Sequence, residues 1–180
     1  MDKQALAKKF FKRPRSAAVN ITGKCNLKCI YCAATGINDV SELTYKQWQT
    51  ICEKLRKAGA TQAIAITGGE PFLHPYIEQI CNDALLMFPK IGILTNGMLL
   101  GPAKDWLVQL KPKKRMEFVI SLDGGSCSDN AKTRVGSNFS EILSNAQFLV
   151  DIGFTVKSAC TVTKHLTKES INMMLGHLFS

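Results

Sequence analysis

Three cysteines are spaced so that their thiolates could bind one metal centre. Cys25, Cys29 and Cys32 follow the pattern C-x3-C-x2-C within one short segment. Thiolate sulfur is a preferred ligand of zinc and of iron–sulfur clusters. The same spacing would also place three residues on one face of a helix, where cysteine packs as a small apolar residue. Chance is a poor explanation for these offsets in a chain with seven cysteines, so we expect a shared metal centre.

Zinc and an iron–sulfur cluster are the two candidates for this centre. A structural zinc site needs four ligands, usually on paired C-x2-C arms, and the sequence has no second pair. A cubane cluster has four irons, so three thiolates leave one iron open to a small chelating molecule. Cys52 and Cys81 fall on apolar faces of expected helices and should pack in the core, whereas Cys127 and Cys160 are isolated.

The composition is that of one water-soluble globular domain. Of 180 residues, 46% are hydrophobic and 21% charged, which excludes a disordered chain and a collagen-like repeat. No apolar stretch approaches the roughly 18 residues that a membrane span needs, and residues 1–15 do not resemble a signal peptide. We therefore expect a cytoplasmic protein with reduced thiols, which disfavours a disulfide framework.

The net charge of +9 favours an anionic partner. Part of the excess lies in a basic N-terminal segment, residues 1–16, and part in Lys111, Lys113, Lys114 and Arg115. Two solvated basic stretches are the expected interpretation. Contact with a nucleic acid or an anionic lipid is the alternative.

Apolar runs of strand length alternate with stretches that have the apolar period of helices. Strands are expected at residues 17–22, 62–67, 90–94, 116–122 and 154–162, and helices at 44–58, 75–88, 102–110, 140–150 and 167–179. This alternation predicts an α/β fold with a parallel sheet. A closed βα barrel of eight strands needs about 250 residues. The chain should therefore form an open partial (βα) barrel of about five to six parallel strands with helices outside.

Polar motifs follow the expected strands, at the edge where functional loops gather. After the second strand, Gly68 and Gly69 would allow a close approach to a ligand, and the Glu70 carboxylate could meet an ammonium group. Asn96 and Ser121 follow the third and fourth strands. Ser121 could donate to a hydroxyl or carboxylate, whereas ordinary turn chemistry is the alternative explanation of the Gly-Gly and Asn-Gly pairs.

The segment Cys25-Asn26-Leu27-Lys28-Cys29-Ile30-Tyr31-Cys32 resembles the signature of the radical S-adenosylmethionine (radical SAM) superfamily, and later segments resemble its SPASM-type branch. The resemblance implies a [4Fe–4S] cluster on the three cysteines and S-adenosyl-L-methionine (SAM) at the open iron. It also implies that the GGEP motif receives the amino group of SAM, that Arg134 binds its carboxylate and that Tyr31 lies near its adenine. The implied cofactor-binding residues are Tyr31, Gly68, Gly69, Glu70, Asn96, Ser121 and Arg134.

The implied reaction is reductive cleavage of SAM to a 5′-deoxyadenosyl radical, which takes hydrogen from a peptide or a cofactor precursor. An electron donor such as flavodoxin or ferredoxin would be a partner. Alternatives are an activase of a glycyl-radical enzyme, an RNA-modifying enzyme, and a non-catalytic metal-binding or electron-transfer module. No catalytic side chain is predicted; we expect His74 to be structural.

The resemblance also sets the expected domain organisation. Residues 17–180 would form a radical SAM core that lacks the last βα unit and any C-terminal auxiliary domain. The missing unit suggests a completing subunit or a homo-oligomer, because an uncovered sheet edge favours association.

Overall fold

Five parallel strands form a curved sheet, and they follow one another across it in the order of the chain. The computed structural model describes residues 15–32, 41–59 and 62–179. The sheet has the order β1-β3-β4-β5-β7, and each neighbouring pair is parallel. Its strands are β1 (Ser16–Thr22), β3 (Ala63–Gly68), β4 (Lys90–Thr95), β5 (Met116–Ser121) and β7 (Thr155–Ala159). The predicted parallel α/β architecture is thus confirmed.

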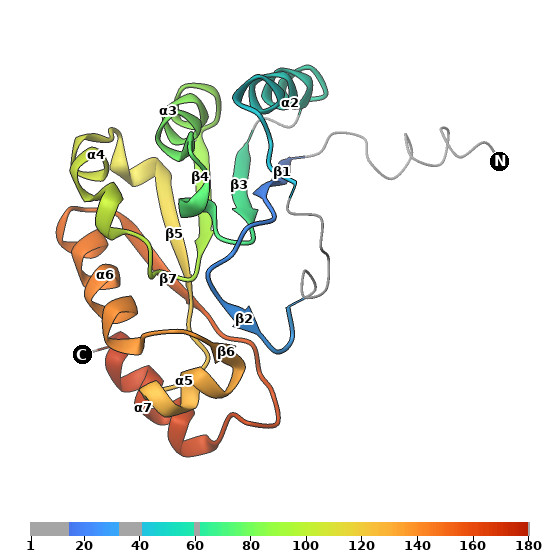
Figure 1. Ribbon diagram of the computed structural model, residues 1–180. Coiled ribbons are helices and arrows are strands. Elements are labelled where there is room, and N and C mark those ends of the chain that lie inside the picture. The colour runs from blue at the N-terminus through green and yellow to red at the C-terminus, as the bar shows by residue number, and fades with distance from the viewer. Residues whose placement is uncertain (1–14, 33–40, 60–61, 180) are drawn as a thin grey trace.

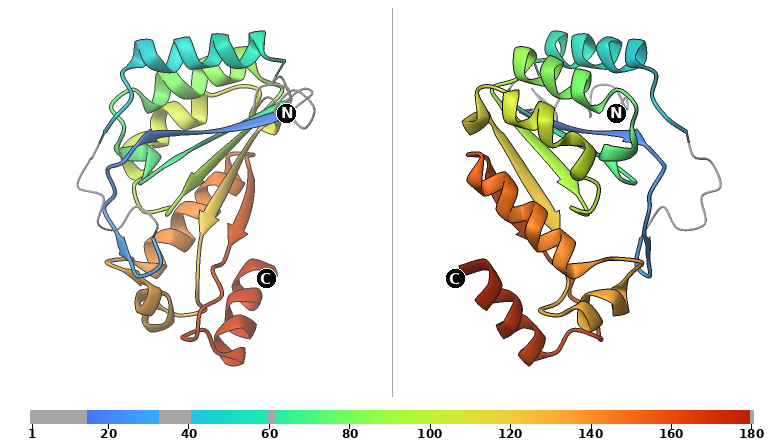
Figure 2. Two further views of the ribbon diagram at one scale, coloured as in Figure 1. Left: turned by 90° about the vertical axis from the view of Figure 1, so that its right-hand side faces the viewer. Right: turned by 60° about the vertical axis from the view of Figure 1, so that its left-hand side comes forward.

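The helices that connect these strands cover one face of the sheet, as Figures 1 and 2 show. They are α2 (Tyr45–Lys57), α3 (Ile77–Met87), α4 (Lys104–Gln109) and α6 (Phe139–Asp151). The outward-facing side chains of the strands pack beneath them; Ile64, Ile66, Ile91 and Phe118 are at most 1% exposed. The core therefore lies between the sheet and its helices, which leaves the concave face of the sheet uncovered by these helices.

Small residues line this concave face. Ala18, Ala65, Gly92 and Glu117 lie side by side in the register of the four successive strands. Because three of these side chains are very small, they leave a hollow of about 550 Å³ over the amino-terminal half of the sheet. The curved sheet has the form of an open half-barrel (Figures 1 and 2).

Capping residues fix the ends of α2. The Thr44 hydroxyl accepts a hydrogen bond from the Gln47 N–H, and the Gln47 side chain accepts one from the Thr44 N–H. This reciprocal capping box satisfies N–H groups that a helix leaves unpaired. Gly59 follows the helix with a φ of 84°, a left-handed conformation that suits glycine and stops the helix. The predicted boundaries of this helix, residues 44–58, agree closely with α2.

Two predicted elements differ from the structure. The last strand ends at Ala159 instead of continuing to residue 162, because the Thr161 N–H donates to the Asp123 carboxylate at 2.9 Å. The helix predicted at residues 102–110 is divided into a 3-10 turn, η2 (Gly101–Ala103), and α4.

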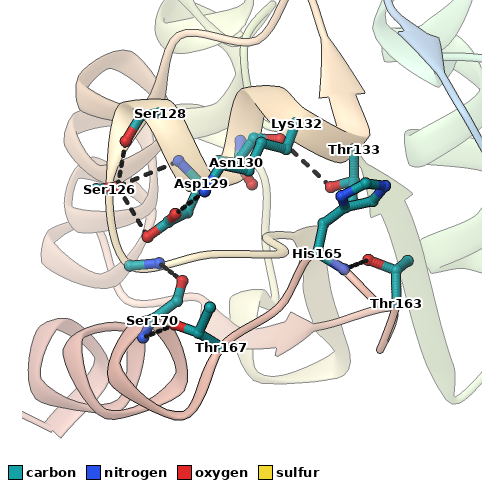
Figure 3. A network of polar contacts seen from close by, with 11 residues as sticks. Ser126, Ser128, Asp129, Asn130, Lys132, Thr133, Thr163, His165, Thr167 and Ser170 are labelled. Carbon is teal, nitrogen blue, oxygen red and sulfur yellow. Dashed lines mark hydrogen bonds and ion pairs between the residues drawn. The ribbon is translucent and has the colours of Figure 1, made fainter.

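A short helix between β5 and α6 was not predicted. This helix, α5 (Cys127–Thr133), packs with α7 (Lys168–Phe179) beyond the carboxyl ends of the strands (Figures 1 and 3). The Gly125 N–H donates to the Ser170 hydroxyl at 3.1 Å. A Cβ atom on Gly125 would lie 2.4 Å from that of Met173, so glycine is required for this close packing. Within the described ranges, no helix is both long and apolar enough to cross a membrane.

Candidate cluster and cofactor site

One cavity collects nearly all of the predicted site residues. Its volume is about 180 Å³, and it lies at the carboxyl ends of β3, β4 and β5. The predicted residues that line it are Cys25, Cys29, Tyr31, Cys32, Gly68, Gly69, Asn96, Ser121 and Arg134. Glu70 does not line the cavity; its side chain is buried beside it. Segments that are far apart in the sequence thus meet where the strands end.

A short antiparallel pairing holds the cysteine segment in place. The strand β2 (Lys28–Cys29) pairs with β6 (Arg134–Val135), and Cys29 lies directly opposite Arg134. The Ile30 N–H also donates to the Thr133 carbonyl at 2.9 Å. The segment that contains the three cysteines is therefore a strand with turns, and the alternative of a helical stripe is wrong.

The three thiols share the cavity and affect one another electrostatically. Burial is the main cause that raises the pKa of Cys29; Arg134 opposes the shift, and charges on Cys25 and Cys32 add to it. Burial also raises the pKa of Cys25, and a charge on Cys32 contributes. Cys25 and Cys32 are exposed, and Cys29 is partly exposed, so the thiols are accessible from the cavity.

This arrangement fits a cluster better than a single zinc ion. In the described part of the chain, no group of three His, Cys, Asp or Glu side chains could hold one metal ion. In an iron–sulfur cubane each thiolate binds a different iron, so the thiols need to border one cavity without meeting at a point. The thiols of Cys25, Cys29 and Cys32 satisfy that requirement, and the zinc alternative finds no support among the described residues.

The remaining cysteines lie away from this centre. Cys52 and Cys81 are fully buried in the core, as predicted. Burial raises the pKa of Cys52 to about 12 and that of Cys81 further. Cys127 is exposed at the start of α5, and Cys160 is partly buried just after β7.

Gly68 and Gly69 bring the end of β3 against the chain that leads into the cysteine segment. The Gly69 N–H donates to the Thr22 carbonyl, and the Glu70 N–H donates to the Lys24 carbonyl, both at 2.7 Å. A Cβ atom on Gly68 would lie 2.3 Å from the Thr22 oxygen, and one on Gly69 would lie 2.2 Å from the Lys24 oxygen. The close approach that these glycines permit is therefore to the protein's own backbone, as well as to the cavity that they line.

The Glu70 carboxylate is turned into the protein. The side chain is fully buried and accepts hydrogen bonds from the Thr95 hydroxyl, the Asn96 N–H and the Phe72 N–H at 2.7, 2.7 and 3.1 Å. Burial raises its pKa, and the three donors oppose that shift. The sequence interpretation paired this carboxylate with a ligand ammonium; in the structure it pairs with groups of the protein.

Asn96 and Ser121 border the cavity from neighbouring strands. The Asn96 amide donates to the Asn26 side chain at 2.8 Å and accepts from the Met98 N–H at 3.0 Å. Asn96 thus joins the cysteine segment to the loop after β4 and also makes the turn that its Asn-Gly sequence predicts. Ser121 is the last residue of β5 and lies opposite Ala159 of β7.

Arg134, Tyr31 and Asp123 form a compact group at the cavity wall. Arg134 is 7% exposed, and its Nε lies 3.0 Å from Asp123 Oδ2. The guanidinium carbon lies over the Tyr31 ring, 5.6 Å from the ring centroid, and Nη1 lies 3.9 Å from the Cys29 sulfur. Burial and the hydrogen bond to Asp123 raise the pKa of Tyr31 to about 12. Nothing local in the sequence indicated this role of Asp123.

His74 has the structural place expected of it. The ring is 2% exposed; its Nε2 lies 2.8 Å from the Leu43 carbonyl, and its Nδ1 accepts from the Tyr76 N–H at 3.1 Å. With Nδ1 as the acceptor, Nε2 carries the proton and donates to Leu43.

The basic stretch at residues 111–115 is engaged partly within the protein. Lys113 donates to the Ile152 carbonyl, and Arg115 donates to the carbonyls of Leu85, Phe88 and Pro89. These contacts agree with a structural interpretation of the stretch. The basic residues of the N-terminal segment before residue 15 lie outside the described residues.

Known proteins resemble this chain over almost its whole length. The antilisterial bacteriocin subtilosin biosynthesis protein AlbA of Bacillus subtilis is 32% identical over 156 residues, covering 84% of this chain and 34% of AlbA. The mycofactocin maturase MftC of Mycobacterium ulcerans is 28% identical over 147 residues, covering 81% of this chain and 39% of MftC. The crystal structure of Streptococcus suis SuiB bound to S-adenosylmethionine superposes with a TM-score of 0.79 at 22% identity, over 96% of this chain and 39% of SuiB.

The SuiB superposition shows that this chain and SuiB share their fold over the aligned part. The chain spans between a third and two fifths of the length of AlbA and MftC. The Radical SAM superfamily model matches residues 19–178, a range that includes the three cysteines and every other residue of the cavity. The superfamily uses a [4Fe–4S] cluster and SAM, and this chain belongs to it.

Proposed function

We propose that this chain is the core of a radical SAM enzyme that modifies a peptide or a cofactor precursor. The observation that carries the proposal is the single cavity in which the thiols of Cys25, Cys29 and Cys32 face the end of β3 and Arg134. A bound cluster would supply the electron that cleaves SAM to the 5′-deoxyadenosyl radical. The protein would supply the ligands, the orientation of the cofactor and an enclosed site.

Each part of the cavity has a proposed task. The three thiolates would hold the cluster. The guanidinium of Arg134 suits the carboxylate of SAM, because its planar fork can donate two parallel hydrogen bonds. Backbone groups of Gly68 and Gly69 would receive the amino group, and Glu70 would act indirectly by holding the Asn96 backbone. Tyr31 and Ser121 are the remaining polar side chains of the cavity wall. Leu27 and Leu94 also line the cavity and would limit the access of water to it.

The hollow on the concave face of the sheet favours a substrate of peptide size. Leu94 is 41% exposed and borders both the cavity at the cysteines and the larger hollow over the sheet. A substrate on the concave face would therefore reach the cofactor past Leu94. The names of the relatives point the same way, since AlbA serves bacteriocin biosynthesis and MftC is a maturase. An electron donor such as flavodoxin or ferredoxin belongs to the proposal.

The test is release of 5′-deoxyadenosine from SAM. Protein reconstituted anaerobically with iron and sulfide should absorb broadly near about 400 nm. After reduction with dithionite it should release 5′-deoxyadenosine. Each of Cys25→Ala, Cys29→Ala and Cys32→Ala should abolish both signals, whereas Cys127→Ala, at an exposed position on α5, should keep both. Colourless protein that retains one zinc ion, or a cluster that releases no 5′-deoxyadenosine, would contradict the proposal.

The substrate class needs a separate measurement. Peptides encoded beside the gene can be prepared in deuterated form and added to the reduced enzyme with unlabelled SAM. Deuterium in the 5′-deoxyadenosine would identify the peptide as the hydrogen donor. Deuterium transfer from a small cofactor precursor, and from no peptide, would favour the other substrate class.

A further inference from the structure

Asp123 is the point at which three separate segments of the chain meet beside the cavity. Its side chain is fully buried at the loop after β5. The Oδ2 atom accepts from the Tyr31 hydroxyl and from the Thr133 hydroxyl at 2.9 Å, and it forms the ion pair with Arg134. The Oδ1 atom accepts from the Thr161 N–H. One carboxylate thus joins the cysteine segment, the α5–β6 segment and the chain that follows β7.

The Arg134 ion pair fixes the direction of the guanidinium. Asp123 meets Arg134 at Nε, on one side of the planar group, while Nη1 lies toward Cys29. The contact at Nε is an ion pair without the alignment of a hydrogen bond. Attraction between the two charges opposes rotation of the guanidinium away from Asp123, and Nη1 stays toward Cys29, which lines the cavity. The carboxylate also accepts a hydrogen bond from the Tyr31 hydroxyl, and this contact holds the ring beneath the guanidinium.

The backbone holds the carboxylate itself in place. The Asp123 N–H donates to the Asn130 side chain at 2.8 Å, and the Asn130 amide donates to Ser137 at 2.9 Å. A Cβ atom on Gly124 would lie 2.6 Å from that of Asp129. Asp123 is therefore anchored to α5 and has little freedom to follow a moving arginine.

We propose that Asp123 is a positioning residue for SAM: it orients Arg134 toward the cofactor carboxylate and holds Tyr31 at the cavity wall. This inference rests on the proposed function, because it assigns SAM to the cavity. Asp123 acts through Arg134 and Tyr31 and does not touch the cofactor. Its loss should weaken SAM binding while the cysteines still assemble the cluster.

Asp123→Asn tests the proposal, with Asp83→Asn as the matched control. Asp83 accepts a hydrogen bond from the Tyr45 hydroxyl at 2.8 Å between α2 and α3. Both variants therefore alter a Tyr–Asp contact, but of the two tyrosines only Tyr31 lines the cavity. The measurements are iron per chain, the cluster absorption, and the Kd for radiolabelled SAM by equilibrium dialysis. Asp123→Asn should raise the Kd about tenfold or more, because the ion pair that orients Arg134 is lost. Its iron content should match that of the control.

A double-mutant cycle with Arg134→Met separates positioning from a general loss of structure. If Asp123 acts mainly through Arg134, Asp123→Asn should raise the Kd much less in the Arg134→Met background than in the wild type. An equal effect in both backgrounds, or a Kd equal to that of Asp83→Asn, would overturn the inference.

If Asp123→Asn does not fold, Thr133→Val is used in the same Kd measurements. That variant removes one neutral donor to Asp123 and leaves the ion pair in place. It should raise the Kd about threefold in the wild type and much less with Arg134→Met. No change in Kd would overturn the inference. A wild-type protein that binds neither iron nor SAM would instead refute the proposed function.

Discussion

Glu70 Oε2 accepts a hydrogen bond from the Asn96 N–H at 2.7 Å, and this bond joins the end of β3 to the loop after β4. Asn96 in turn donates through its side chain to Asn26 in the cysteine segment. A buried carboxylate therefore determines where the backbone of a cavity residue lies. Two motifs that the sequence separates by about twenty-five residues act as one unit at the cavity.

Glu70→Ala should destabilise the protein as well as impair SAM cleavage. The change leaves the Thr95 hydroxyl and the N–H groups of Asn96 and Phe72 without their acceptor. A buried donor without a partner costs about 1–3 kcal/mol, so the free energy of unfolding should fall by at least about 2 kcal/mol. Urea unfolding measures the loss, and Glu53→Ala on the exposed side of α2 is the control. Equal stability of the two variants would show that Glu70 has no such role.

Gly69→Ala should disturb assembly of the cluster. A Cβ atom there would lie 2.2 Å from the Lys24 carbonyl oxygen and 2.8 Å from that of Gly23. Because both contacts are to backbone, the chain that enters Cys25 must move, at a cost of about 1–3 kcal/mol. Iron per chain after reconstitution should fall, together with the melting temperature. Gly101→Ala, where no atom lies within 4 Å of the added carbon, should retain wild-type iron; an equal iron content in Gly69→Ala would contradict the prediction.

The order of strands and helices could be predicted from the sequence because it depends on local patterns. Apolar period and capping residues such as Thr44 are read within one element, and the parallel order follows from their alternation. The helix α5 escaped prediction because CSDNAKT has no apolar period. The signal that could have found it is Ser126 with Asp129 three residues later, a capping pattern.

The candidate site was predictable where the spacing of residues carries the chemistry. Cys25, Cys29 and Cys32 were identified by their offsets, and the structure places all three on one cavity. The partners of Glu70 and Asp123 were not predictable, because each carboxylate meets donors from other elements. Which backbone faces a carboxylate is decided by tertiary packing, and composition or spacing along the chain does not encode it.

Arg115→Met should lower stability even though Arg115 belongs to a basic stretch. Its guanidinium donates to the carbonyls of Leu85, Phe88 and Pro89, near the end of α3. Hydrogen bonds to a charged group contribute about 1.5–3 kcal/mol, and the free energy of unfolding should fall by about that amount. Lys114→Met removes a neighbouring, exposed charge and is the control. If the two variants unfold alike in urea, the contacts of Arg115 contribute nothing to stability.

The acid dependence of stability should change in Asp129→Asn. Lys132 is the main cause that lowers the pKa of Asp129 below its ordinary value of 3.8, and the hydroxyls of Ser170 and Ser126 contribute. The Ser170 contact joins α5 to the start of α7, where the same hydroxyl also accepts from the Gly125 N–H (Figure 3). A carboxyl whose pKa is lowered by folding stabilises the folded state fully above its unfolded pKa and loses that contribution as the pH falls through the folded value. The cluster-free wild type should therefore melt about 1–3 °C above Asp129→Asn at pH 7. This difference in melting temperature should close below about pH 4.

Thermal melts followed by circular dichroism measure the difference, and Glu53→Gln is the control for loss of one exposed carboxylate. A gap that stays constant down to acid pH would show that the Asp129 charge does not stabilise the junction of α5 and α7.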